Sequence, residues 1–438
     1  MMLNSIPYLS VGLDVGADFT WMSIMLPNGT LTGKPFKILH SDPASRDLAV
    51  AKIKEAQETY SLGSRCFLES TGIYHIPLLC FLRDKGFDCS VINPIITKNS
   101  TNMNIRKLHN DKFDSKKAAK VGLDASIKTS IIPDDSVADL RNLVRDYYYF
   151  KDLQSAVVLK LNAELKVSFP AYLDIFSKTT TQCSLKLLEA YPLAADLLAA
   201  PKDEIVGLIR ATARFGEKYA LSKYDAICTA AKDASVFGRS LKSSAVRIRL
   251  YISSYREYQK HLDDILETLH ESVDRMQGTA VYDRICLLQS LRGVGFLSAV
   301  VLIAEMGNFD LFSSPKKLYA YFGLDPAVKQ SGKFNGDKVH MSKRGSSLAR
   351  RILHMVALNN LKVDKGTKTP VNPVIYGYYT DKCKSKKKNV AVGAVMHKIC
   401  NIIFAMLRDN KPFEMITPQE HCERYAMEHP DKTGVNAA

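Results

Sequence analysis

The segment YLSVGLDVGADFT, residues 8–20, places one carboxylate inside an apolar run. Val11, Leu13 and Val15 follow the alternation of a buried strand, and glycines flank the acid, Asp14. Burying a carboxylate costs several kcal/mol unless another group pairs with it. The chain must therefore supply or bind a partner for Asp14.

The residues around this segment predict an α/β domain with a mixed sheet. Patterns typical of strands occupy residues 8–16, 20–27, 34–39, 65–70 and 88–94. Two helical patterns lie among them: residues 43–60, with Leu48, Ile53 and Ala56 at helical spacing, and residues 75–86, ending at Gly86. Strands come first and then alternate with helices, which favours a mixed sheet.

Two long helical patterns follow, at residues 136–168 and 242–274, and neither contains an internal proline or glycine. They predict the two arms of an antiparallel helical hairpin. Further helical patterns flank Gly293-Val294-Gly295. We therefore expect an N-terminal α/β domain over 1–130, a helical domain over 131–283, a mainly α-helical domain over 284–415 and a flexible tail over 416–438.

The composition indicates a polyanionic partner. The 438 residues include 60 Lys and Arg against 45 Asp and Glu, a net charge of +15. Such an excess most often indicates nucleic acid, and the alternative is a generally basic soluble protein. The nine cysteines are scattered without a CxxC pair, so reduced thiols are expected rather than disulfides or zinc. With no signal-peptide pattern and no membrane-length apolar run recognised, the expected location is cytoplasmic, without a membrane partner.

Four acids are candidates for a metal site: Asp14, Glu69, Asp111 and Asp114. Glu69 ends a strand pattern, and the spacing of Asp111 and Asp114 puts both on one helix face. Converging carboxylates repel one another, and a divalent cation removes that repulsion. Oxygen ligands favour Mg²⁺ or Mn²⁺ over zinc, and such ions support phosphoryl transfer. The alternative is a hydrogen-bonded strand aspartate beside an ordinary helix cap.

A rival interpretation concerns DVGADFT, residues 14–20, which resembles the first phosphate loop of actin-like and sugar-kinase ATPases. Those proteins carry a second glycine-rich loop that contains an aspartate. The segments GVG at 293 and FGLD at 322 lack the order of an acid followed by glycines. The ATPase interpretation is therefore disfavoured.

Five motifs in order resemble the DEDD transposases of the IS110 and IS1111 insertion-sequence families. They are VGLDVGADF, FLESTGIYH, HNDKFDSKKA, the segment from LRGVGFLSAV to YFGLDP, and SG at 331–332 with MSKRGSSLARRIL. This sequence has Ser115 where the family usually has alanine. Another register, starting at Asp114, would place Lys117 at the fourth acid; the register Asp111/Asp114 is preferred because it keeps both acids.

The resemblance implies a fold and a mechanism. The N-terminal domain would be ribonuclease H-like, similar to RuvC-type Holliday-junction resolvases, and would hold Mg²⁺ on the four acids. The helical arms would be an inserted coiled coil used in assembly, as a dimer or tetramer. The mainly α C-terminal domain would supply a serine nucleophile, here Ser331. Family members recombine DNA through a covalent serine–DNA intermediate, and some use a non-coding guide RNA from their own element, so DNA and a guide RNA are the expected partners.

Ser331 needs activation, because a serine hydroxyl is a weak nucleophile at neutral pH. His340 is nine residues away, and a core or surface role is the alternative for it. A metal on the acids would lower the barrier by polarising the phosphate. Without the resemblance, a flexible polar loop with turn residues is the favoured interpretation of QSGKFNG, residues 330–336. Two rival functions follow: a metal-dependent junction nuclease in which water attacks, and a non-catalytic nucleic-acid-binding protein.

Basic residues beyond Ser331 are the candidates for phosphate contact. They form two groups, the first within 343–351 and the second within 382–388: Lys343, Arg344, Arg350 and Arg351; and Lys382, Lys384, Lys386, Lys387 and Lys388. The alternative for the lysine run is a solvated loop.

Overall fold

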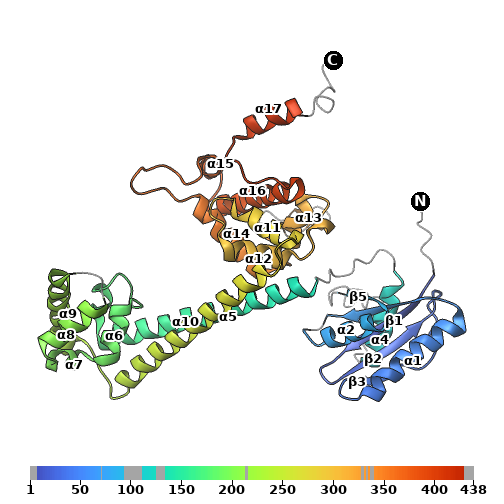
Figure 1. The fold of residues 1–438 in the computed structure, drawn as a ribbon, viewed down its shortest axis with the longest axis horizontal. Coiled ribbons are helices and arrows are strands. Elements are labelled where there is room, and N and C mark those ends of the chain that lie inside the picture. The colour runs from blue at the N-terminus through green and yellow to red at the C-terminus, as the bar shows by residue number, and fades with distance from the viewer. Residues whose placement is uncertain are drawn as a thin grey trace. The chain divides into compact units, whose positions relative to one another are not determined.

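The computed structural model describes residues 7–70, 72–92, 111–124, 134–212, 216–326, 330–331, 334–335 and 340–428. The chain divides into two compact units, Met1–Asp134 and Asp135–Ala438 (Figure 1). The first unit contains the sheet and the second is almost entirely helical.

The first unit is built on a five-stranded mixed sheet with the order β3-β2-β1-β4-β5. Its strands are β1 (Leu9–Val15), β2 (Phe19–Met25), β3 (Phe36–Leu39), β4 (Ser64–Glu69) and β5 (Asp88–Ile92). Strand β2 runs antiparallel to β1 and β3, whereas β4 runs parallel to β1 and β5. The predicted mixed sheet is confirmed; Asn93 and Pro94 of the last predicted strand lie outside the described residues.

One face of the sheet packs against α1 (Pro43–Tyr60) and α2 (His75–Asp84). Alternate residues of β1, among them Val11 and Leu13, join Ile53 of α1 and Leu82 of α2 in this core. The predicted helix 43–60 has its expected bounds, but Leu48 is 49% exposed, and Ala49 and Val50 are buried in its place.

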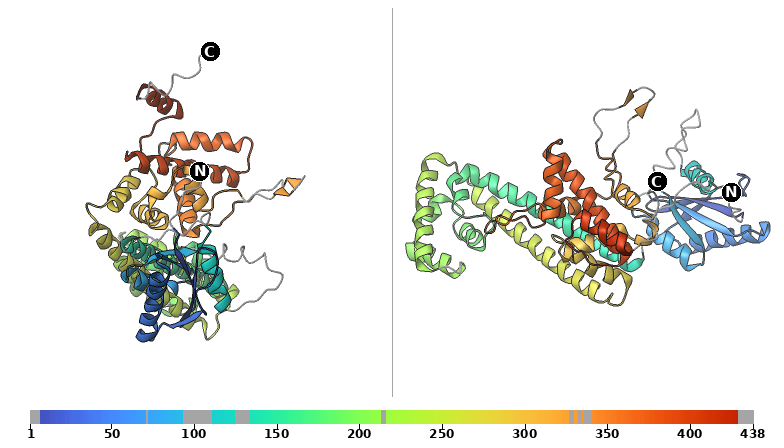
Figure 2. Two further views of the ribbon diagram at one scale, coloured as in Figure 1. Left: turned by 90° about the vertical axis from the view of Figure 1, so that its right-hand side faces the viewer. Right: turned by 90° about the horizontal axis from the view of Figure 1, so that it is seen from above.

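The opposite face of the sheet is covered by α4 (Asp111–Gly122) (Figure 2). Gly12 of β1 allows the helix to come unusually close. A Cβ atom at Gly12 would lie 2.1 Å from the backbone nitrogen of Ala119 and 2.2 Å from the carbonyl oxygen of Ser115. The hydroxyl of Ser10 donates a hydrogen bond of 2.6 Å to the carbonyl of Ala119. Strand and helix are therefore in backbone contact.

The second unit begins with two long helices, α5 (Asp135–Ser168) and α10 (Ser244–Asp274), which pack along each other (Figure 1). Gln154 bonds to Gln259 at 2.9 Å, while Glu164, further along α5, pairs with Arg247, earlier in α10. The two helices are thus antiparallel, as the sequence predicts.

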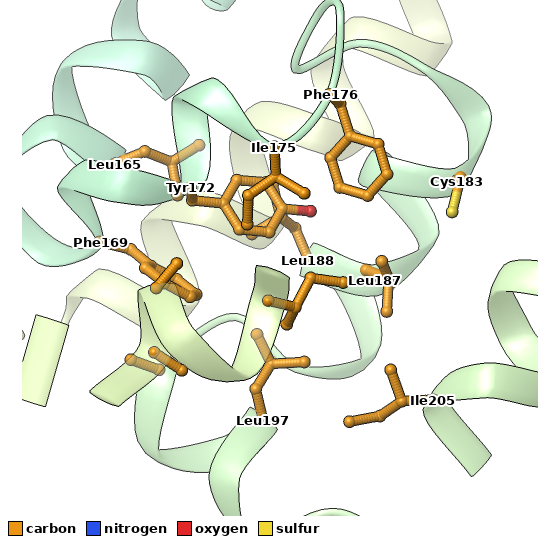
Figure 3. Close-up of a cluster of buried hydrophobic side chains, with 14 of the residues drawn as sticks. Leu165, Phe169, Tyr172, Ile175, Phe176, Cys183, Leu187, Leu188, Leu197 and Ile205 are labelled. Carbon is orange, nitrogen blue, oxygen red and sulfur yellow. The ribbon is translucent and has the colours of Figure 1, made fainter. Parts of the chain in front are cut away.

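Four helices connect these arms and share one apolar core (Figure 3). They are α6 (Gln182–Ala190), α7 (Ala194–Ala199), α8 (Lys202–Thr212) and α9 (Glu217–Phe237), preceded by the 3₁₀ turn η2 (Pro170–Asp174). Tyr172 is completely buried at the centre, and its hydroxyl lies within hydrogen-bonding distance of the carbonyl and hydroxyl of Ser184. This core fixes the far end of the two arms.

The remaining elements form the C-terminal part of the second unit. They are α11 (Ala280–Gln289), α12 (Phe296–Met306), η3 (Phe309–Leu311), α13 (Pro315–Tyr321), β6 (Gln330–Ser331), β7 (Phe334–Asn335), α14 (Ser347–Asn360), α15 (Pro373–Cys383), α16 (Lys388–Asp409) and α17 (Pro418–Glu428). The last of these helices lies within the stretch 416–438, expected to be a flexible tail, of which 429–438 lie outside the described residues.

One expectation about apolar segments needs correction. Helix α16 is long and apolar enough to cross a membrane by length and composition, with a mean hydropathy of 1.9 over 18 residues. The sequence analysis did not recognise a membrane-length apolar run here because His397, Lys398 and Asn401 interrupt it. More than half of that window is buried, and Ile399 and Ile403 pack inside the unit, as in a core helix.

Replacing Gly12 with alanine tests the contact between β1 and α4. The added methyl group meets backbone atoms that cannot rotate away, so we expect a loss of roughly 1–3 kcal/mol in the free energy of unfolding. Trp21, the only tryptophan, lies on β2 and reports unfolding of the first unit. Urea unfolding followed by its fluorescence measures the effect.

The matched control is Gly33→Ala, because a Cβ atom at Gly33 has no neighbour within 4 Å. An unfolding midpoint for Gly12→Ala equal to that of the control would contradict the backbone contact.

Candidate active site

Asp14 and Glu69 lie side by side at the carboxyl ends of two parallel strands. Leu13 of β1 is in register with Leu68 of β4, so the acid that follows each leucine comes to the same edge of the sheet. Strand side chains alternate between faces, and Asp14 therefore shares its face with Gly12, the face that α4 covers.

Helix α4 brings two more acids to the same place. Asp111 and Asp114 stand in its first turn. Burial and, in decreasing order, the charges of Asp114, Glu69 and Asp111 together raise the pKa of Asp14 to about 7. The structure thus brings the three other predicted acids within electrostatic reach of Asp14.

Two lysines of α4 lie near these acids. The ammonium of Lys117 lies 2.5 Å from Oδ1 of Asp114, and its charge lowers the pKa of Asp14. The ammonium of Lys112 lies 4.7 Å from the ring centre of Trp21, which is the register partner of Asp14 on β2. The only tryptophan therefore sits beside the acid cluster.

Ser115, at the position where the resembled family usually has alanine, has a structural partner here. Its hydroxyl is completely buried and donates to the carbonyl of Lys112 at 3.0 Å. Its oxygen then accepts from the hydroxyl of Ser23 on β2 at 2.8 Å. The extra hydroxyl is satisfied, and it ties the first turn of α4 to the sheet.

The chemistry of the donor set suits a hard divalent cation, because every candidate ligand is a carboxylate. The acids are not gathered into a finished coordination shell: in the described part of the chain, no three His, Cys, Asp or Glu side chains are close enough to hold one ion. Mutual repulsion is a physical reason for carboxylates to stay apart without a cation between them. Asp14, Glu69, Asp111 and Asp114 are the residues that would hold Mg²⁺ or Mn²⁺.

Ser331 belongs to the second unit. It lies in β6 and pairs with Phe334 of β7, and its side chain lies outside the described part of the structure. His340 is exposed.

The first basic group, within 343–351, contains two residues that are exposed and two that form hydrogen bonds or ion pairs within the fold. Lys343 and Arg344 are exposed just before α14. Arg350 instead donates to the carbonyls of Phe322 and Gly345 at 2.9 and 2.7 Å, which holds the α13–α14 connection.

Arg351 pairs with Asp152 of α5 through two contacts of 2.8 and 2.9 Å and lies over the ring of Tyr148. Among these candidates, Lys343 and Arg344 are the more accessible for phosphate contact.

The lysine run extends from the last turn of α15 through the connection to the first residue of α16. Lys384, Lys386, Lys387 and Lys388 are exposed, and Lys382 is half-buried over the ring of Tyr378. Lys384 forms an exposed ion pair of 3.2 Å with Asp381. Such a pair contributes little to the stability of the fold.

The sequence analysis missed the residues that position the cluster, namely Gly12, Ser23 and the pairing of Lys117 with Asp114. One signal was present: the buried residues of α4 are mostly small, with Ser115, Ala118, Ala119 and Gly122 at helical spacing. A stripe of small residues opposite a glycine in a strand indicates close approach of two backbones.

The pKa of Asp14 predicts how stability depends on pH without metal. The folded protein holds this proton up to about pH 7, whereas the unfolded chain releases it near 3.8. Folding is therefore disfavoured progressively as the pH rises from about 4 to about 7. Asp14→Asn removes this contribution. In EDTA, the urea midpoint of Asp14→Asn minus that of wild type should therefore increase between pH 5 and pH 8. A difference in urea midpoint that stays constant over this pH range would contradict the raised pKa of Asp14.

Comparison with known proteins gives two family matches. Residues 11–170 match a family described as Transposase, the DEDD transposase family of IS110. Residues 286–372 match the Transposase IS116/IS110/IS902 family. The first match contains the four acids, and the second contains Ser331 and the basic residues 343–351. Lys382 to Lys388 lie outside both.

Individual relatives are more distant. The chain is 33% identical over 97 residues to "Putative transposase y4qE" of Sinorhizobium fredii, covering 22% of this chain and 24% of the relative. It is 28% identical over 134 residues to "Insertion element IS110 uncharacterized 43.6 kDa protein" of Streptomyces coelicolor, covering 30% and 31%. It is 25% identical over 170 residues to "Pilin gene-inverting protein" of Moraxella bovis, covering 38% and 51%.

The alignments thus span between about a quarter and half of these relatives. The two family matches together cover more than half of the chain, in the order in which the motifs occur. The chain belongs to the IS110 family of transposases, with a DEDD N-terminal region and a C-terminal region of the IS116/IS110/IS902 type.

Proposed function

We propose that this chain is a DNA recombinase that mobilises an insertion sequence by cutting and rejoining DNA strands. The observation that carries the proposal is the placement of four acids at one edge of the sheet: Asp14 and Glu69 at the adjacent ends of β1 and β4, and Asp111 and Asp114 in the first turn of α4, which packs on both strands. Four acids on two parallel strands and one helix start repel one another. A divalent cation gives the arrangement a chemical role.

The proposed fold of the first unit is ribonuclease H-like, with the acids at the carboxyl ends of β1 and β4 and at the start of α4. Asp14 and Glu69 are fixed by the sheet, and Asp111 and Asp114 are fixed by the contact of α4 with Gly12. Bound Mg²⁺ or Mn²⁺ would polarise the phosphate and neutralise its charge. The carboxylates would position the ion against the scissile phosphate, and one that stays ionised would accept the proton of the attacking group.

The proposed nucleophile is Ser331, which would form a covalent serine–DNA intermediate. Its support is the match of residues 286–372 to the family. A relative is named for inverting a pilin gene, and inversion of a DNA segment also requires strands to be cut and rejoined. We further propose a guide RNA, a dimer or tetramer and a cytoplasmic location, on the family resemblance alone.

The second candidate function is a metal-dependent junction nuclease in which water attacks. The acid cluster lies wholly within the first unit, and a nuclease needs nothing more. Ser331 would then be structural.

A protein–DNA adduct separates these functions. Wild type with end-labelled element DNA and Mg²⁺ should leave labelled protein on a denaturing gel. Ser331→Ala should give neither adduct nor nick while keeping its DNA affinity, because binding does not need the hydroxyl. Nicking by Ser331→Ala near the wild-type rate would favour the nuclease.

Each acid should be needed for strand cleavage. Asp14→Asn, Glu69→Gln, Asp111→Asn and Asp114→Asn remove a ligand charge but little volume, so we expect a folded protein with cleavage reduced by roughly a hundredfold or more. Unchanged cleavage by Asp114→Asn would exclude the register Asp111/Asp114.

The lysine run should contribute to the salt dependence of DNA binding. Replacing Lys384, Lys386, Lys387 and Lys388 with alanine should flatten the slope of log affinity against log salt, because fewer counterions are released. The control replaces four exposed lysines of α6, of α9 and of the segment just before α10: Lys186, Lys218, Lys232 and Lys242. Equal slopes in the two variants would identify the run as a solvated loop.

A further inference from the structure

Lys117 is an unusually buried lysine. Its side chain is 14% exposed, and its ammonium lies 2.5 Å from Oδ1 of Asp114, one turn earlier on α4. It also lies 4.7 Å from the ring centre of Phe113. Lysine is rarely this buried unless it is paired, and burial makes such a pair less exposed to screening by salt and water. By contrast, Lys120 on the same helix is exposed.

The partner of Lys117 is one of the four acids of the cluster. The ammonium also acts on Asp14, whose pKa it lowers while the three other acids raise it. Within the described first unit, the ammonium of Lys117 is therefore a cation inside a group of mutually repelling carboxylates. It occupies the electrostatic role that a divalent metal is expected to fill.

We propose that Lys117 is an internal counter-ion of the acid cluster, which competes with the divalent metal for Asp114. This inference rests on the proposed metal site and gives a role to Lys117, which the preferred register of the acid motif leaves without one. In the metal-free protein the ammonium neutralises part of the cluster and holds Asp114. A cation that binds Asp114 has to displace it.

The competition follows from charge and space. A carboxylate oxygen 2.5 Å from an ammonium nitrogen has its nearest side occupied, and a second cation at that oxygen is repelled by the first. The flexible four-carbon stem of lysine allows the ammonium to move away when the metal arrives. The affinity of the site for the metal is therefore lower than it would be with the four acids and no Lys117.

The experiment titrates Mn²⁺ into the full chain without DNA. Free Mn²⁺ is measured by electron paramagnetic resonance, and bound Mn²⁺ by quenching of Trp21, which lies opposite Asp14 in the sheet. Lys117→Met keeps the length of the side chain and removes its charge. We expect it to bind Mn²⁺ roughly three- to tenfold more tightly than wild type.

Two variants serve as controls. Lys120→Met removes the same charge from an exposed position of α4 and should leave the affinity within roughly twofold of wild type. Lys117→Arg retains the charge and should bind Mn²⁺ no more tightly than wild type. The urea midpoint of each variant, read from Trp21, shows whether it is folded.

Equal or weaker Mn²⁺ binding by folded Lys117→Met would overturn the competition while leaving the metal site intact. A similar gain in Lys120→Met would also overturn it, because the effect would then be one of net charge. If neither wild type nor folded Lys117→Met bound Mn²⁺, the proposed metal site itself would fall, and the role of Lys117 with it.

Discussion

Helix α4 lies on strand β1 at Gly12 with no side chain between the two backbones. The position of the acid cluster depends on this contact, because Asp14 belongs to the strand and Asp111 and Asp114 to the helix. A longer residue at 12 would move the helix outward and separate the acids. The buried hydroxyls of Ser10 and Ser23 add directional bonds that fix where along the strand the helix sits.

The cluster that results is unfavourable by itself. Burial and three neighbouring charges hold the pKa of Asp14 near neutrality, so the metal-free fold carries an electrostatic cost that grows with pH. The apolar core on the opposite face of the sheet stabilises the unit against that cost. Lys117 reduces it further. A site held together by packing, and not by its own charges, is suited to receive a cation.

The sequence predicted the sheet well, because the alternation of apolar residues in β1 and β2 is a local signal. It also predicted the candidate acids, since Asp111 and Asp114 are neighbours on a helix. The contacts across the fold were not predictable: Ser23 meets Ser115 across 92 positions of the sequence. Which face of α4 meets the sheet decides that pairing, and no local pattern specifies it. The motifs indicated acids, so Lys117 appeared in the sequence analysis only as the residue that an alternative register would place at the fourth acid. Its charge was given no role there.

The central claim is that α4 and β1 together bind a divalent metal, and anomalous scattering from crystals of the full chain grown with Mn²⁺ tests it most directly. The account predicts an anomalous peak bonded to Asp14 and Asp114, with metal–oxygen distances of roughly 2.0–2.2 Å and the ammonium of Lys117 withdrawn from Asp114. A structure at saturating Mn²⁺ with no peak among the four acids, and with Lys117 still paired to Asp114, would contradict it.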